Sequence, residues 1–253
     1  MLKTTVRLNY NYGFKWFERD HLKVKGWVID ESGKSHRDND LVDYFSSVKD
    51  VEDLKNLLAR TTGHFSAILI FEEFLLAVVD RGRSIPLYFK NDAGHVQISD
   101  SGFSLGSEYD PYSFEEYLAA GHVTQNKTLL RDISQLGAGE IGCFTKDDVV
   151  IISYFEFLPS QQILEPFELS VKRFVEILDS DYKNLIKGLN GRTVVVPLSG
   201  GYDSRSIASM LKRHGYQNVI CYSFGYDQNP DMTTSKKVAE ALGYRWFFLE
   251  TNH

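Results

Sequence analysis

Residues 192–204 read Arg-Thr-Val-Val-Val-Pro-Leu-Ser-Gly-Gly-Tyr-Asp-Ser. The β-branched run predicts a strand, and Ile207, Met210 and Leu211 recur at the spacing of a helix that begins soon afterwards. The Ser-Gly-Gly-x-Asp-Ser turn therefore joins a strand to a helix start. Such a turn is a natural anion site, because the free N–H groups and the positive end of the helix dipole face the same point.

Each residue type in this turn suits phosphate chemistry. Gly200 and Gly201 let the backbone approach phosphate oxygens without a Cβ clash. Ser199 and Ser204 add hydroxyl donors, and Asp203 either caps the helix or holds a Mg²⁺ that bridges phosphates. The alternative is an ordinary strand-to-helix turn whose glycines serve geometry alone.

The rest of the chain divides into two predicted domains, 1–158 and 166–253, joined by a linker with prolines near both ends. After a predicted helix at 167–189, strands and helices alternate in the second domain, which favours a parallel sheet with ligands at the carboxyl ends of its strands. The predicted strands are 193–198, 219–224 and 244–249, and the helices 203–214 and 232–242. The first domain reads as short strands at 24–29, 67–70, 75–79, 86–89 and 149–154, with helices at 51–60 and 114–120.

The loop resembles the pyrophosphate-binding PP-loop of ATP pyrophosphatases, and residues 219–225 and 235–243 resemble the next strand and helix of asparagine synthetases. The resemblance implies ATP and Mg²⁺ as cofactors. It implies pyrophosphate bound by Ser199, Gly200, Gly201, Asp203 and Ser204, the metal on Asp203, and adenine against Leu198 and Phe224. Core burial is an equally weighted alternative for Phe224.

The first half is similar to the same family in three ordered segments, 62–67, 80–89 and 133–139. The implied fold is of the α/β and α+β classes. An N-terminal αββα sandwich of the Ntn-hydrolase type precedes a parallel-sheet PP-loop domain, like that of adenine nucleotide alpha hydrolases, which is incomplete at its C-terminal end. The family's synthetase domain continues past its third strand to an acidic element and a lysine. We therefore expect a fragment, or a homo-oligomer or partner chain that supplies the rest, and nucleotide binding without complete adenylation by these 253 residues alone.

Two departures from the family bear on chemistry. Leu2 follows Met1 where glutamine-dependent members carry a nucleophilic cysteine, and the glutamine-binding Asn-Gly-Glu is replaced in the stretch 28–33. We therefore expect no glutaminase activity, as in the similar β-lactam synthetases. Arg205 stands where a small or hydroxyl residue is commoner, and it either reaches a phosphate or forms a surface salt bridge.

The expected function is that of an ATP-dependent, AMP-forming ligase that adenylates a small-molecule carboxylate for attack by an amine or ammonia. The alternative is a non-catalytic nucleotide-binding or scaffold protein, which would bind ATP without releasing AMP. A third alternative, a tRNA-modifying PP-loop enzyme, is disfavoured by the acidic charge and the glutaminase-like first half.

Composition limits the partners. The net charge of -6 and the lack of a basic run argue against nucleic acid, and no apolar stretch is long enough to span a membrane. Cys143 and Cys221 lie in apolar runs and read as free buried thiols. With no signal-peptide pattern at the N-terminus, these features favour the cytoplasm.

Overall fold

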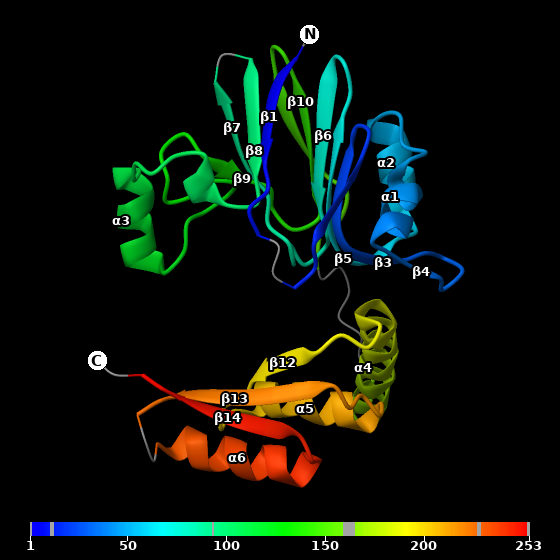
Figure 1. The fold of residues 1–253 in the computed structure, drawn as a ribbon, viewed down its shortest axis with the longest axis vertical. Helices are drawn as coiled ribbons and strands as arrows, with labels where there is room; N and C mark the ends of the chain where they lie inside the picture. The colour runs from blue at the N-terminus through cyan, green and yellow to red at the C-terminus, as the bar shows by residue number, and fades with distance from the viewer. Residues whose placement is uncertain (1, 11–12, 93, 159–164, 227–228, 252–253) are drawn as a thin grey trace. The chain divides into compact units, whose positions relative to one another are not determined.

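The computed structural model describes residues 2–10, 13–92, 94–158, 165–226 and 229–251. The chain forms two compact units, 1–161 and 162–253 (Figure 1). Most of the linker predicted between residues 158 and 166 lies outside the described residues. Within the described ranges no helix is long and apolar enough to cross a membrane.

The N-terminal unit contains two stacked β-sheets. One has the order β1(Lys3–Arg7), β8(His95–Ser99), β7(Tyr88–Asp92) and β9(Ser134–Gln135). The other has the order β11(Val149–Ser153), β10(Glu140–Thr145), β6(Phe74–Val79), β5(Thr62–Ile70), β3(Leu22–Ile29) and β2(Trp16–Arg19), with β4(Ser35–Arg37) also paired to β3. The pair β1–β8 is parallel, and the remaining named pairs of this unit are antiparallel.

Strand β6 shows how the layers are held together. Its side chains alternate between faces, so Leu76 and Val78 enter the core beneath α1(Asn39–Phe45) and α2(Val51–Ala59). Leu75 and Ala77 enter the core between the two sheets. Helix α3(Pro111–Ala120) lies on the far side, beyond β7 and β9 (Figure 1). This α–β–β–α order confirms the predicted sandwich.

The C-terminal unit is a parallel sheet in the order β12(Val194–Pro197), β13(Val219–Gly225) and β14(Arg245–Glu250). Helices α4(Phe167–Leu189), α5(Tyr202–Arg213) and α6(Pro230–Leu242) alternate with these strands, which confirms the predicted fold class. The core joins Leu198 and Cys221, at the sheet, to Ala208, Leu211 and Ala239 on α5 and α6.

The start of helix α3 differs from the predicted one, and its N-terminal cap explains the difference. Helix α3 begins at Pro111, three residues before the predicted start, because the Asp110 side chain accepts a hydrogen bond from the Ser113 N–H at 2.8 Å. This backbone hydrogen bond also lowers the pKa of Asp110. Gly121, in the left-handed region with φ 77°, ends the helix.

Candidate anion-binding site

The loop at 199–204 begins at the carboxyl edge of the parallel sheet. The Leu198 N–H donates to the Tyr222 carbonyl at 2.7 Å, and the Ser223 hydroxyl donates to the Leu198 carbonyl at 2.6 Å. These bonds fix the chain beside the end of β13 immediately before it turns into α5. The Leu198 side chain is only 2% exposed and packs in the core. Its contact with adenine stays a prediction.

Ser199 and Ser204 are hydrogen-bonded to each other and to the backbone of the loop. The Ser204 hydroxyl lies 3.0 Å from the Ser199 hydroxyl and accepts the Ser199 N–H at 3.0 Å. The Ser199 hydroxyl in turn accepts the Gly201 N–H at 3.2 Å. Both hydroxyls therefore shape the turn, which brings the predicted residues Ser199 to Ser204 into one compact loop.

A carboxylate from the next helix already occupies the loop. The Gly200 N–H donates to Oδ1 of Asp231, in the first turn of α6, at 3.0 Å. A Cβ built on Gly200 would lie 2.5 Å from the same oxygen. The approach of an anionic oxygen therefore requires glycine here, while the binding of phosphate by this loop stays a prediction.

Sequence reasoning missed Asp231. The signal was present, because this acidic residue opens the helix that follows the second strand, at the same sheet edge as the loop. Its neighbour Asn229 caps α6 by accepting the Met232 N–H at 2.7 Å. That cap fixes the first turn of α6, and with it the position of Asp231.

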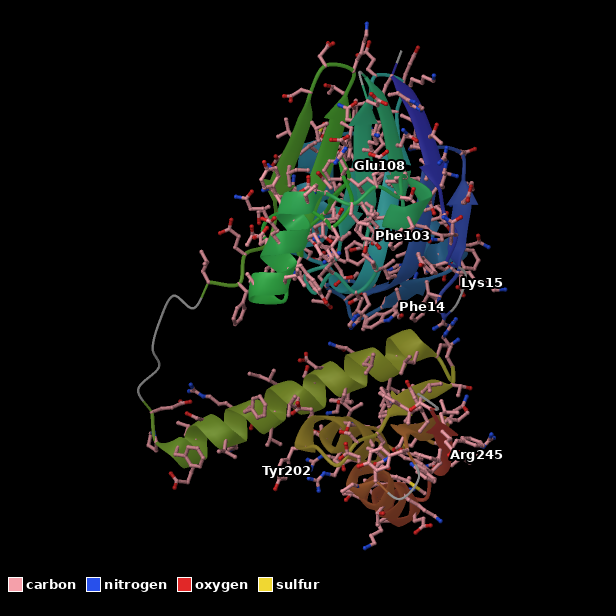
Figure 2. The ribbon with its side chains drawn as sticks, turned by 90° about the vertical axis from the view of Figure 1, so that its left-hand side faces the viewer. Phe14, Lys15, Phe103, Glu108, Tyr202 and Arg245 are labelled. Atoms are coloured by element: carbon pink, nitrogen blue, oxygen red, sulfur yellow. The ribbon has the colours of Figure 1, made fainter. Side chains whose placement is uncertain are left out.

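The start of α5 presents charged and aromatic groups beside the loop. Asp203 is exposed in the first helical turn, and no group of three metal-binding side chains occurs within the described ranges. Tyr202 is 83% exposed (Figure 2). The Arg205 guanidinium stacks over its ring with 4.5 Å between Cζ and the ring centre.

Arg205 Nε also donates to the Gly201 carbonyl at 2.9 Å. Among the described residues Arg205 forms no salt bridge, so the surface ion pair left open by the sequence is not found among them. The guanidinium instead remains at the loop, where a positive charge suits an anion site.

Phe224 lies at the end of β13 and is 63% exposed. It pairs in register with Leu249, which is 52% exposed, whereas its neighbour Ser223 is buried. The core-burial alternative for Phe224 is therefore wrong. Its ring is accessible to a planar ligand, although adenine contact stays a prediction.

The N-terminal unit lacks an accessible thiol at its first strand. Leu2 is 8% exposed and belongs to the core between the sheets. Cys143 is partly buried and Cys221 is buried, both are free, and burial raises the pKa of both thiols. Neither is disposed to act as a thiolate nucleophile.

The C-terminal unit is a parallel α/β unit whose 199–204 loop lies at the carboxyl ends of its strands. Residues 190–252, which contain the loop and strands β12, β13 and β14, match the family model described as asparagine synthase. No curated protein sequence matches the chain at a significant level.

Two solved structures are similar to the chain at 10% identity. Glutamine phosphoribosylpyrophosphate amidotransferase from B. subtilis, complexed with ADP and GMP, aligns with a TM-score of 0.34 over 92% of this chain and 47% of its own. A structure of the allosteric regulatory enzyme of purine biosynthesis aligns with a TM-score of 0.32 over 92% and 46%. The chain spans less than half of either structure.

Proposed function

We propose that the 199–204 loop binds the pyrophosphate portion of ATP, as part of an AMP-forming ligase of the asparagine synthase type. The observation that carries the proposal is the Gly200 N–H, which holds a carboxylate oxygen of Asp231 at 3.0 Å. A phosphate oxygen is likewise an anionic acceptor for that N–H. The asparagine synthase match at 190–252 supports the same assignment.

The proposed roles follow from the positions of the residues. The Gly200 N–H and the α5 dipole, at whose start Gly201 lies, would hold the phosphate oxygens, while the two serine hydroxyls keep the turn in shape. The exposed Asp203 carboxylate suits Mg²⁺, which prefers oxygen ligands and travels with nucleotide phosphates. Phe224, exposed at the end of β13, offers a flat apolar surface to adenine.

In the proposed reaction a substrate carboxylate oxygen attacks the α-phosphorus of ATP. The bond between the α-phosphorus and the bridging oxygen breaks, and pyrophosphate leaves with that electron pair. The loop would contribute by positioning and by neutralising the charge on the leaving group. An amine or ammonia then displaces AMP from the acyl group to form the amide, and we propose that this chain does not generate ammonia from glutamine itself.

Calorimetric titration of MgATP into matched variants tests the proposal. Gly201→Val places a branched side chain at the loop and should weaken binding at least about tenfold. Ser209→Val, a change on an exposed position of α5 away from the loop, should leave the affinity unchanged. Equal affinities of wild type and Gly201→Val would indicate that the loop is a structural turn and does not bind the nucleotide. Binding without AMP release for any carboxylate, even when a downstream segment or a partner chain supplies the rest of the synthetase domain, would favour a nucleotide-binding scaffold.

A further inference from the structure

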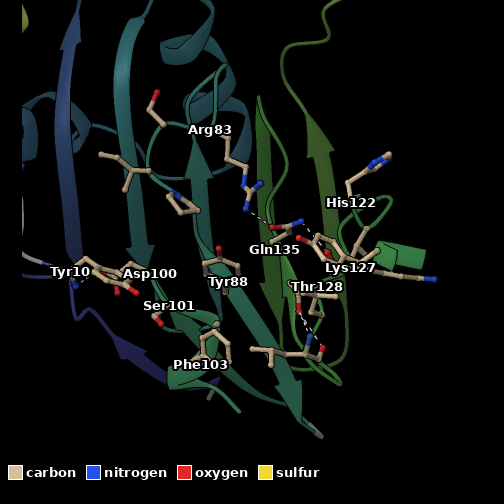
Figure 3. Close-up of a pocket in the computed structure, with 18 of the residues that line it drawn as sticks. Tyr10, Arg83, Tyr88, Asp100, Ser101, Phe103, His122, Lys127, Thr128 and Gln135 are labelled. Atoms are coloured by element: carbon tan, nitrogen blue, oxygen red, sulfur yellow. Dashed lines mark hydrogen bonds between the residues drawn. The ribbon is translucent and has the colours of Figure 1, made fainter. Parts of the chain in front are cut away.

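The N-terminal unit contains a cavity that the proposed ATP site does not use. Its volume is about 790 Å³, which lies within the range of small-molecule sites. The loop that follows β6, the strand β7 and the segments around Asp100 and Lys127 line it (Figure 3). The cavity thus lies wholly within one unit, and its walls come from described residues distant in the sequence.

A buried lysine lines this cavity. Lys25, on β3, is 6% exposed and lies on the opposite side of the strand from Val24, which faces the helices. Its ammonium donates to the Tyr10 carbonyl and lies 5.7 Å from the centre of the Trp16 ring. Among the described residues it forms no salt bridge. Lysines this buried are normally paired with an anion.

Asp100, the nearby acid, is already engaged. Its carboxylate accepts the N–H groups of Asn9 at 2.8 Å, Tyr10 at 2.9 Å and the Trp16 indole at 2.9 Å. Burial lowers the pKa of Lys25, and the negative charge of Asp100 opposes this shift. Asp100 therefore moderates the cost of burying Lys25 without taking its hydrogen bonds.

A second cation is fixed at the cavity wall by its backbone. Arg83 has φ 52°, a left-handed conformation that is unfavourable for a side chain of this kind. The Asp80 carboxylate holds the loop in that shape by accepting the N–H groups of Gly82 at 2.8 Å and Ser84 at 2.9 Å. Arg83 donates through Nη2 to the Gln135 side chain (Figure 3), while its buried Nε has no partner among the described residues.

Aromatic rings form much of the remaining wall. Tyr88 lies between Arg83 and Phe103 in the view of Figure 3. Phe103 is 67% exposed, Tyr109 55% and Tyr117 44%, and all line the same cavity. Large apolar groups gathered and exposed around one hollow mark a binding site rather than ordinary surface.

We propose that this cavity binds a small aromatic carboxylate. Lys25 and the planar Arg83 guanidinium supply the positive charge that a carboxylate needs, and the tyrosine and phenylalanine rings supply flat faces for an aromatic ring. The proposal is independent of ATP binding, because it rests on residues of the other unit.

Titration calorimetry with 4-hydroxybenzoate as the probe tests this assignment. Wild-type protein should bind it saturably, and should bind the neutral 4-hydroxybenzamide about ten- to a hundredfold more weakly, because charge-assisted hydrogen bonds are lost. Lys25→Met and Arg83→Gln should each weaken binding of the acid by a similar factor. Lys23→Met is the matched control on the same strand, since Lys23 pairs with Glu18 and does not line the cavity. Melting temperatures of all variants establish that each is folded.

Four results would overturn the proposal. Equal affinity for the acid and the amide would show that the cavity does not recognise the carboxylate charge. Unchanged binding in Lys25→Met and Arg83→Gln would show that the probe binds elsewhere. Failure of wild type to bind 4-hydroxybenzoate at millimolar concentration would reject the ligand class. Displacement of the probe by L-glutamine at lower concentration would assign the cavity to an amino acid instead.

Discussion

The carboxylate of Asp231 lies 3.0 Å from the backbone nitrogen of Gly200, so the 199–204 loop after β12 is occupied by a side chain of the same protein. The contact joins the start of α5 to the start of α6 across the sheet edge. Any anion that binds the Gly200 N–H must first displace this carboxylate. Asp231 is therefore an internal competitor of the proposed ligand.

Replacing Asp231 by asparagine should strengthen the binding of pyrophosphate. The amide oxygen still accepts from Gly200, but the repulsion between two anions disappears. Two unit charges about 4 Å apart in water interact by about 1 kcal/mol, which corresponds to about fivefold in affinity. Calorimetry on Asp231→Asn should show this gain. Glu240→Gln, which removes one charge from an exposed position of the same helix, should not. Weaker binding in Asp231→Asn would identify Asp231 as a ligand of the accompanying cation.

Acid should loosen the contact between α4 and α5. Asp179 accepts two hydrogen bonds from Arg213, each 3.0 Å, and lies 3.0 Å from His214 Nε2. The hydrogen bonds from Arg213 are the main cause that lowers the pKa of Asp179. A depressed carboxyl pKa stabilises the fold above the unfolded-state pKa of about 3.9, and this stabilisation is lost as the pH falls through the folded-state pKa.

Asp179→Asn should accordingly melt at a lower temperature than wild type at neutral pH. The two melting temperatures should converge at acidic pH, because protonated Asp179 loses the same ionic interaction as asparagine. Calorimetric melting at a series of pH values measures this difference. A difference that stays constant from neutral to acidic pH would show that the carboxylate charge does not stabilise the contact.

Gly26 and Gly33 both have a positive φ, but only at Gly26 would a side chain also clash with its neighbours. A Cβ on Gly26, at φ 104°, would lie 2.0 Å from the His64 carbonyl oxygen across the β3–β5 pair. A Cβ on Gly33, at φ 80°, would meet nothing within 4 Å among the described residues. Gly33→Ala should cost about 1–2 kcal/mol from its left-handed backbone, and Gly26→Ala more than about 3 kcal/mol. Urea unfolding compares them, and equal losses would refute the steric reading.

Glutamine should not be hydrolysed by this chain. A thiolate nucleophile is required for the expected chemistry, and burial raises the pKa of both Cys143 and Cys221. Purified protein should release no glutamate above the background of buffer in a coupled assay. Activity that survives both Cys143→Ala and Cys221→Ala would reveal a different nucleophile.

The parallel unit was predictable because its signals are local. The helix predicted at 167–189 is α4, and the predicted strands at 193–198 and 219–224 lie within one residue of β12 and β13 at each end. In these segments the hydrophobic period and the flanking glycines agree with the tertiary structure. The position of the 199–204 loop between a strand and a helix could be predicted for the same reason.

Features that depend on contacts between residues far apart in the sequence could not be predicted from the sequence. Strand β1 pairs with β8 through contacts such as Thr4 with Val96, and no sequence pattern within either segment predicts that pairing. Helix α1 was missed because it is short and begins after Asp38, at φ 55° and without a side-chain cap. Lys25 and Arg83 meet in one cavity only after the sheets stack, so no motif links them.

The central claim is that the loop N–H groups bind phosphate oxygens. It is tested most directly by following the backbone amide resonances of Gly200 and Gly201 by nuclear magnetic resonance while pyrophosphate and Mg²⁺ are added. We predict that these two amides show the largest shifts among the assigned glycines and that their hydrogen exchange slows at saturation. Unchanged Gly200 and Gly201 resonances, while other amides respond to pyrophosphate, would contradict the account.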